Sequence, residues 1–413
     1  MAKIKVQNLT KVFGPKPDKA IELLKKGWSK QKILEETGLT VGVNQANFQV
    51  QAGEIFVIMG LSGSGKSTLV RLLNRLIEPT SGTIEIDGKN IATMNMEQLR
   101  EVRRKKLSMV FQRFALFPHR TVAENVEYGL EVQGVEVAKR RQKALQALAM
   151  VGLKGWETSY PDQLSGGMQQ RVGLARALAN DPDVLLMDEA FSALDPLIRK
   201  DMQDELIELQ SNMQKTIIFI THDLDEALKI GDRIALMKDG RIVQVGTPEE
   251  ILTNPADEYV EKFVQDVDMS KVLTAEHVMK RPETITLDRG PRVALQLMRD
   301  RGVSSLYVVD KKKTLLGIVT ADAVAKANQE GLTLEQAMQK EVPIVSPENR
   351  LNELFDLIAF TPIPLAVVNE QHRLLGVIVR GAVLGGLAGK VNQAADNELE
   401  VKEGVVRFGK LIS

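Results

Sequence analysis

Residues 60–68 read GLSGSGKST and directly follow the apolar run IFVIM of residues 55–59. The apolar run is typical of a buried parallel strand, and a helical pattern begins after the loop. Glycine lets a backbone wrap closely around phosphates, and a helix N-terminus attracts their charge, so this order predicts a phosphate-binding loop. We expect Lys66 to reach the terminal phosphates and Ser67 to bind Mg²⁺. The alternative is an ordinary Gly/Ser-rich loop before a helix.

A second apolar run, VLLM at residues 184–187, ends in Asp188 and Glu189. Hydrolysis of Mg·ATP needs one acidic group that holds the metal and another that orients and polarises the attacking water. Asp188 suits the metal, and Glu189, one residue farther out, suits the general base. An acidic pair after a strand is also common as a helix cap, so the pair gains this meaning only together with the phosphate loop.

The composition argues against several classes of protein. The chain has 413 residues, 54 basic and 54 acidic side chains and no cysteine. The length predicts two or three domains, and the zero net charge argues against nucleic-acid binding as the main activity. The lack of cysteine excludes disulfides and thiolate metal sites. We find neither a signal-peptide pattern nor an apolar run of about 18 residues, so any membrane role is expected to come through a partner.

Hydrophobic patterns divide the chain into two parts. Strands are predicted at residues 3–9 and 46–58, with a helical insertion between them at about 15–42. Residues 65–265 then alternate helical patterns with short β-rich runs, which indicates α/β architecture. After about residue 270 the sequence repeats itself at an offset of about 59 residues, so that SLYVVD at 305–310 aligns with PLAVVN at 364–369. Each unit is small, and we expect the two to bury their apolar faces against each other.

A third motif identifies the family that the chain resembles. Residues 164–171 read LSGGMQQR and lie between the phosphate loop and Asp188-Glu189. In identity and order the three motifs resemble an ABC transporter ATPase. The resemblance covers about residues 3–250 and implies an ABC-type P-loop NTPase domain that hydrolyses ATP with Mg²⁺. It also implies a homodimer, in which the signature motif of one subunit covers the nucleotide of the other.

The resemblance implies roles for individual residues. Glu189, His222 and Gln112 would be catalytic, with His222 on the γ-phosphate and Gln112 linking Mg²⁺ and the water to the membrane partner. Mg²⁺ would be held by Ser67, Gln112 and Asp188, and Asp195 belongs to the D-loop. The remaining positions fall into two groups: the ATP-binding residues Phe13, Ser62, Gly63, Ser64, Gly65, Lys66, Ser67 and Thr68, and the signature residues Ser165, Gly166, Gly167 and Gln169.

Phe13 and the segment of residues 112–119 are two further features that the resemblance helps to interpret. Phe13 matches the position where family members often stack an aromatic ring on adenine, but plain core packing also fits. Residues 112–119 resemble the surface that receives a coupling helix of the permease. With the insertion and the run of residues 188–199, the chain looks most like the glycine betaine/proline betaine importer ATPases. That implies a polytopic membrane permease with a substrate-binding domain as partner, no nucleic acid, and a peripheral location on the cytoplasmic face of the cell membrane.

The C-terminal repeat resembles a tandem pair of CBS domains, which commonly bind adenine nucleotides. In the first unit Thr320 and Asp322 fit the positions that contact ribose or phosphate, although Asp322 also suits a helix cap. In the second unit the two corresponding positions are Val379 and Gly381, which lack the polar side chains of Thr320 and Asp322. Arg380 between them could instead contact a phosphate, with adenine on the apolar residues Val345, Ile363 and Ile378, which suggests a site for a cyclic dinucleotide such as cyclic di-AMP. A surface arginine on a structural pair is the alternative. Lys311–Lys313 could sense ionic strength or be merely solvated.

The predicted fold class is therefore an α/β P-loop NTPase domain followed by an α+β tandem CBS pair. The expected domains are the ATPase domain at residues 1–270, CBS domains at 271–331 and 332–390, and an acidic tail at 391–413. Two other functions compete with the transport ATPase. A soluble ABC ATPase of repair or translation would typically carry a long coiled coil or two ATPase units, and a sensor without turnover conflicts with Glu189 and His222.

Overall fold

The computed structural model describes residues 2–112, 114–265 and 267–387. The predicted acidic tail at 391–413 lies outside the described residues, as does Arg113 within the predicted permease-facing segment. The chain forms two compact units, Met1–Val267 and Asp268–Ser413. The fold class predicted from the sequence is confirmed: the first unit is mixed α/β around a parallel sheet, and the second contains the tandem repeat.

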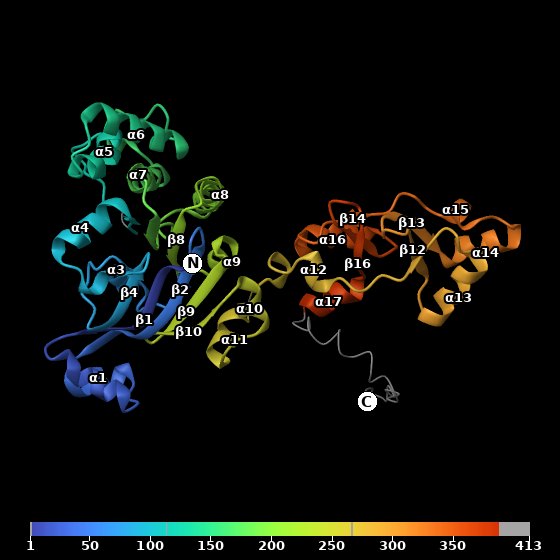
Figure 1. The fold of residues 1–413 in the computed structure, drawn as a ribbon, viewed down its shortest axis with the longest axis horizontal. Helices are drawn as coiled ribbons and strands as arrows, with labels where there is room; N and C mark the ends of the chain where they lie inside the picture. The colour runs from blue at the N-terminus through green and yellow to red at the C-terminus, as the bar shows by residue number, and fades with distance from the viewer. Residues whose placement is uncertain (1, 113, 266, 388–413) are drawn as a thin grey trace, which may run out of the picture. The chain divides into compact units, whose positions relative to one another are not determined.

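Two sheets form the centre of the N-terminal unit (Figure 1). One is antiparallel, in the order β2-β1-β4-β5, and consists of β1 (Ala2–Phe13), β2 (Thr40–Gln51), β4 (Ser81–Ile86) and β5 (Lys89–Asn90). The other has the order β10-β9-β3-β8-β7-β6 and is parallel except for β10; its strands are β3 (Ile55–Met59), β6 (Leu107–Val110), β7 (Val184–Asp188), β8 (Thr216–Thr221), β9 (Arg233–Lys238) and β10 (Arg241–Gly246).

A single hydrophobic core joins the two sheets to α3 (Lys66–Leu73). Every residue of β3, β7 and β8 is buried, as expected for parallel strands covered on both faces. Leu69, Val70, Leu72 and Leu73 extend the same core along α3. The phosphate loop is therefore fixed at both ends by buried elements, a strand before it and a helix after it.

The strand predicted at residues 46–58 is wrong in one respect, because two strands occupy this region. β2 ends at Gln51 and β3 begins at Ile55. Between them the chain turns at Gly53, whose φ of +77° is readily adopted only by glycine, and passes from the antiparallel sheet to the parallel one. Only the short stretch 51–54 separates Val50 from the apolar run that begins at Ile55, which is why hydrophobicity alone did not reveal the turn.

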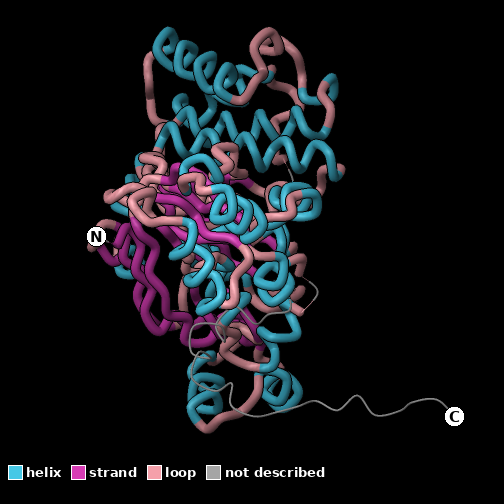
Figure 2. The backbone as a smooth tube through the Cα atoms, turned by 90° about the vertical axis from the view of Figure 1, so that its right-hand side faces the viewer, coloured by secondary structure: helices cyan, strands magenta, loops and turns pink. Residues whose placement is uncertain are grey.

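Some helices of this unit pack against the sheets, and others form a separate helical block. Figure 1 and Figure 2 show α5, α6 and α7 packed together at the top of this unit. After α3 the described part of the unit continues with the helices α4 (Met96–Lys105), α5 (Val122–Val132), α6 (Val137–Met150), α7 (Gly166–Ala179), α8 (Pro196–Met213), α9 (Leu224–Ile230), α10 (Pro248–Thr253) and α11 (Glu258–Val264), with 3-10 turns at Ile91–Thr93 and Pro161–Gln163.

The segment between β1 and β2 forms two short helices, α1 (Pro17–Lys25) and α2 (Lys30–Thr37). Ser29 caps α2 by accepting a hydrogen bond from the backbone N–H of Lys32. A small core of its own, in which Ala20, Leu24 and Ile33 pack against Val12 and Val41, attaches this insertion to the ends of both strands. Leu34, which also belongs to the apolar pattern of the sequence, is instead 47% exposed.

The C-terminal unit contains the same set of elements twice. The first repeat has α12 (Ala275–Val278), β11 (Thr284–Ile285), α13 (Pro291–Arg301), β12 (Ser305–Val309), β13 (Leu315–Thr320) and α14 (Ala321–Glu330), after a 3-10 turn at Met269–Lys271. The second has α15 (Leu334–Ala337), β14 (Ile344–Val345), α16 (Leu351–Phe360), β15 (Leu365–Val368), β16 (Leu374–Ile378) and α17 (Arg380–Leu387). Each repeat builds a three-stranded sheet.

The two repeats exchange their first helices. Ala275 and Val278 of α12 belong to the core of the second repeat, whereas Leu334 of α15 belongs to the core of the first. The methionines that follow these helices are exchanged too. A Cβ on Gly376 would lie 2.6 Å from the sulfur of Met279, and one on Gly317 would lie 2.8 Å from the sulfur of Met338. Each glycine therefore provides the space that the methionine of the other repeat fills.

Candidate functional site

The phosphate loop depends on glycines that no other residue can replace without displacing the backbone. Gly60 has φ +151°, and a Cβ there would lie 2.1 Å from the carbonyl oxygen of Met237. Gly65 has φ +107°, and its Cβ would lie 2.2 Å from the carbonyl oxygen of Gly42. Real Cβ atoms do not approach backbone so closely, so the loop and the strands beside it can only pack with glycine at these places.

Lys66 lies inside this loop. Its side chain is buried, and Nζ donates hydrogen bonds to the carbonyl oxygens of Gly60 at 2.8 Å and Leu61 at 3.2 Å. Burial lowers the pKa of the ammonium, and the negative charges of Glu189 and Asp188 act in the opposite direction. A buried lysine held by two carbonyls inside a loop is well placed to form charge-assisted bonds to phosphate oxygens.

Ser67 and Asp188 form the part of the site that suits a metal ion. Ser67 Oγ, in the first turn of α3, donates a 2.9 Å hydrogen bond to Asp188 Oδ1 at the end of β7. Burial raises the pKa of Asp188, the Ser67 hydrogen bond opposes that shift, and a guanidinium nitrogen of Arg71 lies 3.8 Å from Asp188 Oδ2. A hydroxyl beside a carboxylate fits Mg²⁺, which takes few protein oxygens and completes its shell with phosphate and water.

Glu189 is the point where three loops meet, each following a strand of the parallel sheet. Gln112 Nε2, after β6, donates to Glu189 Oε2 at 3.1 Å and to Ser192 Oγ at 3.3 Å. His222 Nδ1, after β8, lies 3.6 Å from the same Glu189 oxygen, and the imidazole is 58% exposed. The structure thus brings the three predicted catalytic side chains together, because the carboxyl ends of parallel strands share one edge of the sheet.

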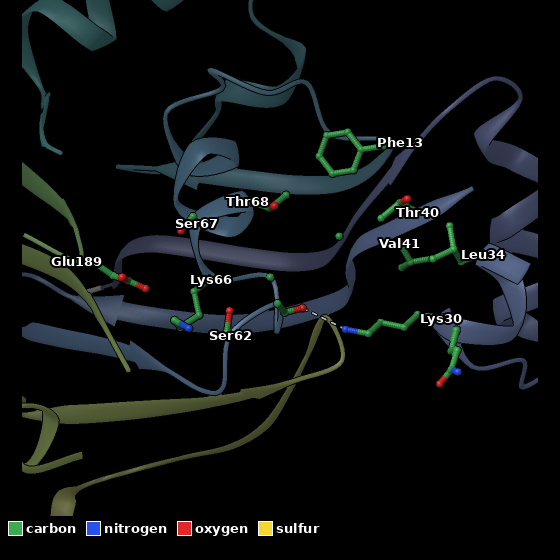
Figure 3. A pocket seen from close by; sticks show the side chains of 14 residues that line it. Phe13, Lys30, Leu34, Thr40, Val41, Ser62, Lys66, Ser67, Thr68 and Glu189 are labelled. Carbon is green, nitrogen blue, oxygen red and sulfur yellow. Dashed lines mark hydrogen bonds between the residues drawn. The ribbon is translucent and has the colours of Figure 1, made fainter. Parts of the chain in front are cut away.

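A pocket of about 610 Å³ extends from this cluster toward the insertion (Figure 3). Lys66, Ser67 and Glu189 lie at one end, and Lys30 and Leu34 of α2 lie at the other. Of the predicted ATP-binding residues, seven line the pocket: Phe13, Ser62, Gly63, Gly65, Lys66, Ser67 and Thr68. Ser64 is buried behind the loop and is not part of this lining.

Phe13 ends β1 and forms a wall of the pocket. The ring is 38% exposed and packs over Gly42, where a Cβ would lie 2.8 Å from a ring carbon. Lys11 Nζ lies 5.1 Å from the ring centroid. The partly open face of the ring is consistent with the predicted stacking on a base, and its contact with Gly42 means that Phe13 also packs against β2.

Sequence reasoning missed the contribution of the insertion to this pocket. Lys30, Gln31 and Leu34 of α2 line it, together with residues 40–42 at the start of β2. No local motif marks these residues, because they reach the phosphate loop only through the tertiary packing of the insertion. The one available signal was Leu34, an apolar side chain on a helix otherwise rich in charge.

The signature residues are not among those that line the pocket. Ser165 caps α7 and accepts a 3.3 Å hydrogen bond from the N–H of Met168, and Gly166 beside it is exposed. The side-chain amide of Gln169 is used internally, donating to the carbonyls of Pro161 and Leu164. Asp195 caps α8 in the same manner as Ser165 caps α7. Gly167 is buried, and a Cβ there would lie 2.6 Å from Ile198.

In the C-terminal unit the structure changes the interpretation of Arg380. Its guanidinium donates to the carbonyl oxygens of Ile358, Ala359 and Thr361 at 3.1–3.2 Å, which caps the C-terminal end of α16. Val345 and Ile378 are 5% and 1% exposed and belong to the hydrophobic core. Arg380 itself is exposed, so the predicted nucleotide site stays a prediction in which the guanidinium, and not the buried Val345 and Ile378, is the accessible group.

The remaining candidates in the C-terminal unit are Thr320, Asp322 and Ile363. Thr320, not Asp322, caps α14 by accepting a hydrogen bond from Ala323, and Asp322 is exposed in the first turn. Ile363 is half-buried beside the core that joins the two sheets. Thr320 and Asp322 thus stay available as polar groups at the start of a helix.

Comparisons with known proteins agree with the site and with the repeat. The family model of the ABC transporter matches residues 43–192, and the model of the CBS domain matches residues 275–330 and 334–389. The glycine betaine transport ATP-binding protein OpuAA of Bacillus subtilis is 64% identical over 399 residues, covering 96% of each chain. The glycine betaine/proline betaine transport system ATP-binding protein ProV of Escherichia coli is 51% identical and covers 93% of this chain and 97% of its own.

A solved structure shares the fold of the N-terminal unit. A dimeric ATP-binding cassette, MJ0796, in a post-hydrolysis state bound to ADP and Pi, is 33% identical, with a TM-score of 0.51. The similarity covers 59% of this chain and 98% of that one. Within the described residues, no helix combines the length and the apolar character needed to cross a membrane.

Proposed function

This chain belongs to the ATP-binding subunits of ABC transporters, ATPases coupled to transport, and we propose that it powers the uptake of glycine betaine or a similar quaternary-amine osmoprotectant. Two relatives named for glycine betaine transport match it over more than nine-tenths of its length. The match includes the C-terminal repeat and the insertion as well as the motifs. The transported solute would be bound by other subunits, since the pocket described here is built for a phosphate group.

The observation that carries the proposal is the convergence of Ser67, Asp188, Glu189, Gln112 and His222 beside the phosphate loop. Lys66 would bind the β- and γ-phosphates, and Ser67 and Asp188 would hold Mg²⁺, which neutralises the charge that develops on the phosphate oxygens. Glu189 would take a proton from the attacking water. Gln112 and His222 would orient that water and the γ-phosphate.

A homodimer would complete the site. Ser165 and Gly166 lie at the start of the 14-residue helix α7, where backbone N–H groups can bind phosphate, but they do not line the pocket of their own chain. A second subunit in head-to-tail orientation would place this helix end over the nucleotide. The related dimeric cassette with ADP and Pi supports such an arrangement.

The partner in the membrane would be a polytopic permease with a substrate-binding domain, contacted through residues 112–119. Gln112 begins this segment and bonds to Glu189, so a movement of the permease could reach the hydrolytic centre through one side chain. The chain would then lie peripherally on the cytoplasmic face of the cell membrane, in a complex with no role for nucleic acid.

We further propose that the CBS pair regulates transport in response to an adenine nucleotide, cyclic di-AMP or ionic strength. The presence of the pair and the exposed Asp322 next to the helix-capping Thr320 support a ligand site in the first repeat. In the second repeat the exposed Arg380, which also caps α16, would be the group that binds phosphate. Regulation requires only unequal binding to two states of the transporter, and a tenfold effect corresponds to about 1.4 kcal/mol.

The test is reconstitution of the chain with its permease in vesicles, followed by measurement of phosphate release and of solute uptake. Glycine betaine should raise ATP hydrolysis and enter the vesicles only when ATP is present, whereas an uncharged sugar should do neither. The Glu189→Gln variant provides the inactive control. Hydrolysis that no quaternary amine stimulates, or uptake that persists without ATP, would refute the proposed function.

A further inference from the structure

The insertion contributes three neighbouring side chains to the pocket, and their positions follow from one face of α2. Lys30 and Leu34 are four residues apart and therefore lie on the same side of the helix, with Gln31 beside them. Ile33, on the flank of this face, packs into the small core that anchors the insertion. Burial of Ile33 thus fixes which side of α2 is turned to the pocket.

Lys30 connects this helix to the phosphate loop. Its Nζ donates a 3.1 Å hydrogen bond to the carbonyl oxygen of Gly63 and lies 3.0 Å from Asp239 Oδ1 in the turn between β9 and β10. Figure 3 shows the side chain extending from α2 toward the loop. The Lys30 and Asp239 side chains are 32% and 62% exposed, so water weakens their attraction and the pair can exchange for another partner.

Leu34 occupies the same end of the pocket and is an exposed apolar group. It is 47% exposed although it is a leucine on the inner face of α2, and it lines the pocket together with Phe13 and Val41. A planar base entering at this end would remove apolar surface of Leu34 from water. The phosphate groups of the same nucleotide would lie along the loop, between Lys66 and the Lys30 ammonium at Gly63.

We propose that α2 is a functional part of the nucleotide site: Lys30 binds the polyphosphate from outside the loop, in exchange for Asp239, and Leu34 covers the base. The inference rests on the proposed ATP site and adds two affinity determinants to it. A polyphosphate carries several negative charges, so it attracts the ammonium more strongly than the single carboxylate of Asp239 does. Nucleotide binding then also holds the insertion against the loop.

The primary test uses the assembled transporter and steady-state ATP hydrolysis. Lys30→Ala should raise KM for ATP about tenfold, the size expected of a partly exposed charge-assisted contact, while kcat at saturating ATP stays within about twofold. Lys30→Arg should restore most of the affinity because the charge is kept. Lys26→Ala is the matched control, since Lys26 is an exposed lysine of the same insertion outside the pocket lining, and it should leave KM unchanged.

A competition assay separates the two side chains. A fluorescent ATP analogue is displaced with ATP or with inorganic tripolyphosphate, which has no base. Lys30→Ala should weaken both competitors by a similar factor, whereas Leu34→Ala should weaken ATP and leave tripolyphosphate unchanged. Loss of tripolyphosphate binding in Leu34→Ala, or equal KM values for wild type and Lys30→Ala, would overturn the inference.

Lys66→Ala distinguishes a failure of this inference from a failure of the ATP site itself. If Lys66→Ala weakens ATP strongly and Lys30→Ala has no effect, the nucleotide site stands and α2 has no part in it. If Lys66→Ala also leaves ATP affinity unchanged, the proposed nucleotide site is wrong and the inference falls with it. If Lys26→Ala raises KM more than Lys30→Ala does, the overall positive charge of the insertion, and not a specific Lys30 contact, attracts the nucleotide. That result would also contradict the inference.

Discussion

Glu189 has a backbone conformation that is unusual for its residue type. Its φ is +48°, in the left-handed region that costs a residue with a side chain about 1 kcal/mol or more. The N–H of Glu189 donates a 3.1 Å bond to the carbonyl of Ile220, which fixes this turn of the chain at the end of β7. The carboxylate is consequently directed to Gln112 and His222, and only 19% of the side chain is exposed.

Glu189→Gln should keep Mg·ATP binding and reduce turnover by at least about 10²-fold, because the amide keeps the shape of the side chain but accepts no proton from water. Phosphate release under single-turnover conditions measures the chemical step, and a nucleotide-binding assay provides the control. The ATP-bound dimer should accumulate in this variant. Phosphate release at the wild-type rate would remove Glu189 from the catalytic role.

Arg380 holds the end of α16 through three backbone carbonyls, which makes it a stabilising group of the second repeat. Arg380→Ala leaves these carbonyls to water and should lower the stability of the C-terminal unit by about 0.5–1.5 kcal/mol, because the three bonds are exposed. Lys is a poorer replacement than its charge suggests, since one ammonium cannot reproduce the planar set of donors. Chemical denaturation followed at the C-terminal unit measures the change; equal midpoints for wild type and Arg380→Ala would contradict the capping role.

At the scale of the element, the role proposed for the start of α7 depends on a second chain. Ser165 and Gly166 are exposed there, and the helix behind them is firmly packed through buried Val172 and Leu174. A substitution at Ser165 therefore changes the exposed end without disturbing the helix core. The element is suited to a test of the head-to-tail dimer.

Ser165→Arg should block ATP-driven dimer closure while the isolated subunit still binds ATP, because the long side chain would occupy the phosphate site of the other subunit. Dimer formation can be followed by size-exclusion chromatography with light scattering, in the Glu189→Gln background that retains ATP. In a mixed dimer, a single Ser165→Arg subunit should impair the site formed with its partner's phosphate loop. Undiminished activity of that mixed dimer would mean that the subunits do not pair head to tail.

The elements also show what sequence could and could not predict. The phosphate loop and the pair Asp188-Glu189 were predictable because strand, loop and helix lie next to each other in the chain. Lys30 was not, because it meets Gly63 and Asp239 only after three distant segments have folded together. The capping contact of Arg380 was not predictable for the same reason, because the α16 carbonyls that it binds come from about 20 residues earlier in the chain.

At the scale of the whole molecule, the chain contains two units with separate hydrophobic cores. The motif residues from Phe13 to His222 all lie in the first unit, and the repeat lies in the second. The catalytic cluster can therefore form without the repeat. Any control by the repeat must instead act on the equilibrium between states of the assembled transporter.

Removal of residues 268–413 should preserve ATP-dependent uptake by the assembled complex and abolish its response to cyclic di-AMP or ionic strength. Uptake of glycine betaine into vesicles at fixed ATP measures both properties, and the full-length chain in parallel vesicles provides the reference. The outcome that would reject a regulatory role is the same inhibition in the full-length and truncated complexes.

The exchange of α12 and α15 between the repeats also restricts how such a gene can change over time. A deletion that ends after one repeat removes Leu334 from the core of the first repeat, and a deletion of the first takes Ala275 and Val278 from the core of the second. The space at Gly317 or Gly376, which the methionine of the deleted repeat fills, is left empty as well. Both repeats are therefore expected to be gained or lost together. A single repeat left by a partial deletion would have an incomplete hydrophobic core and would be degraded by proteases.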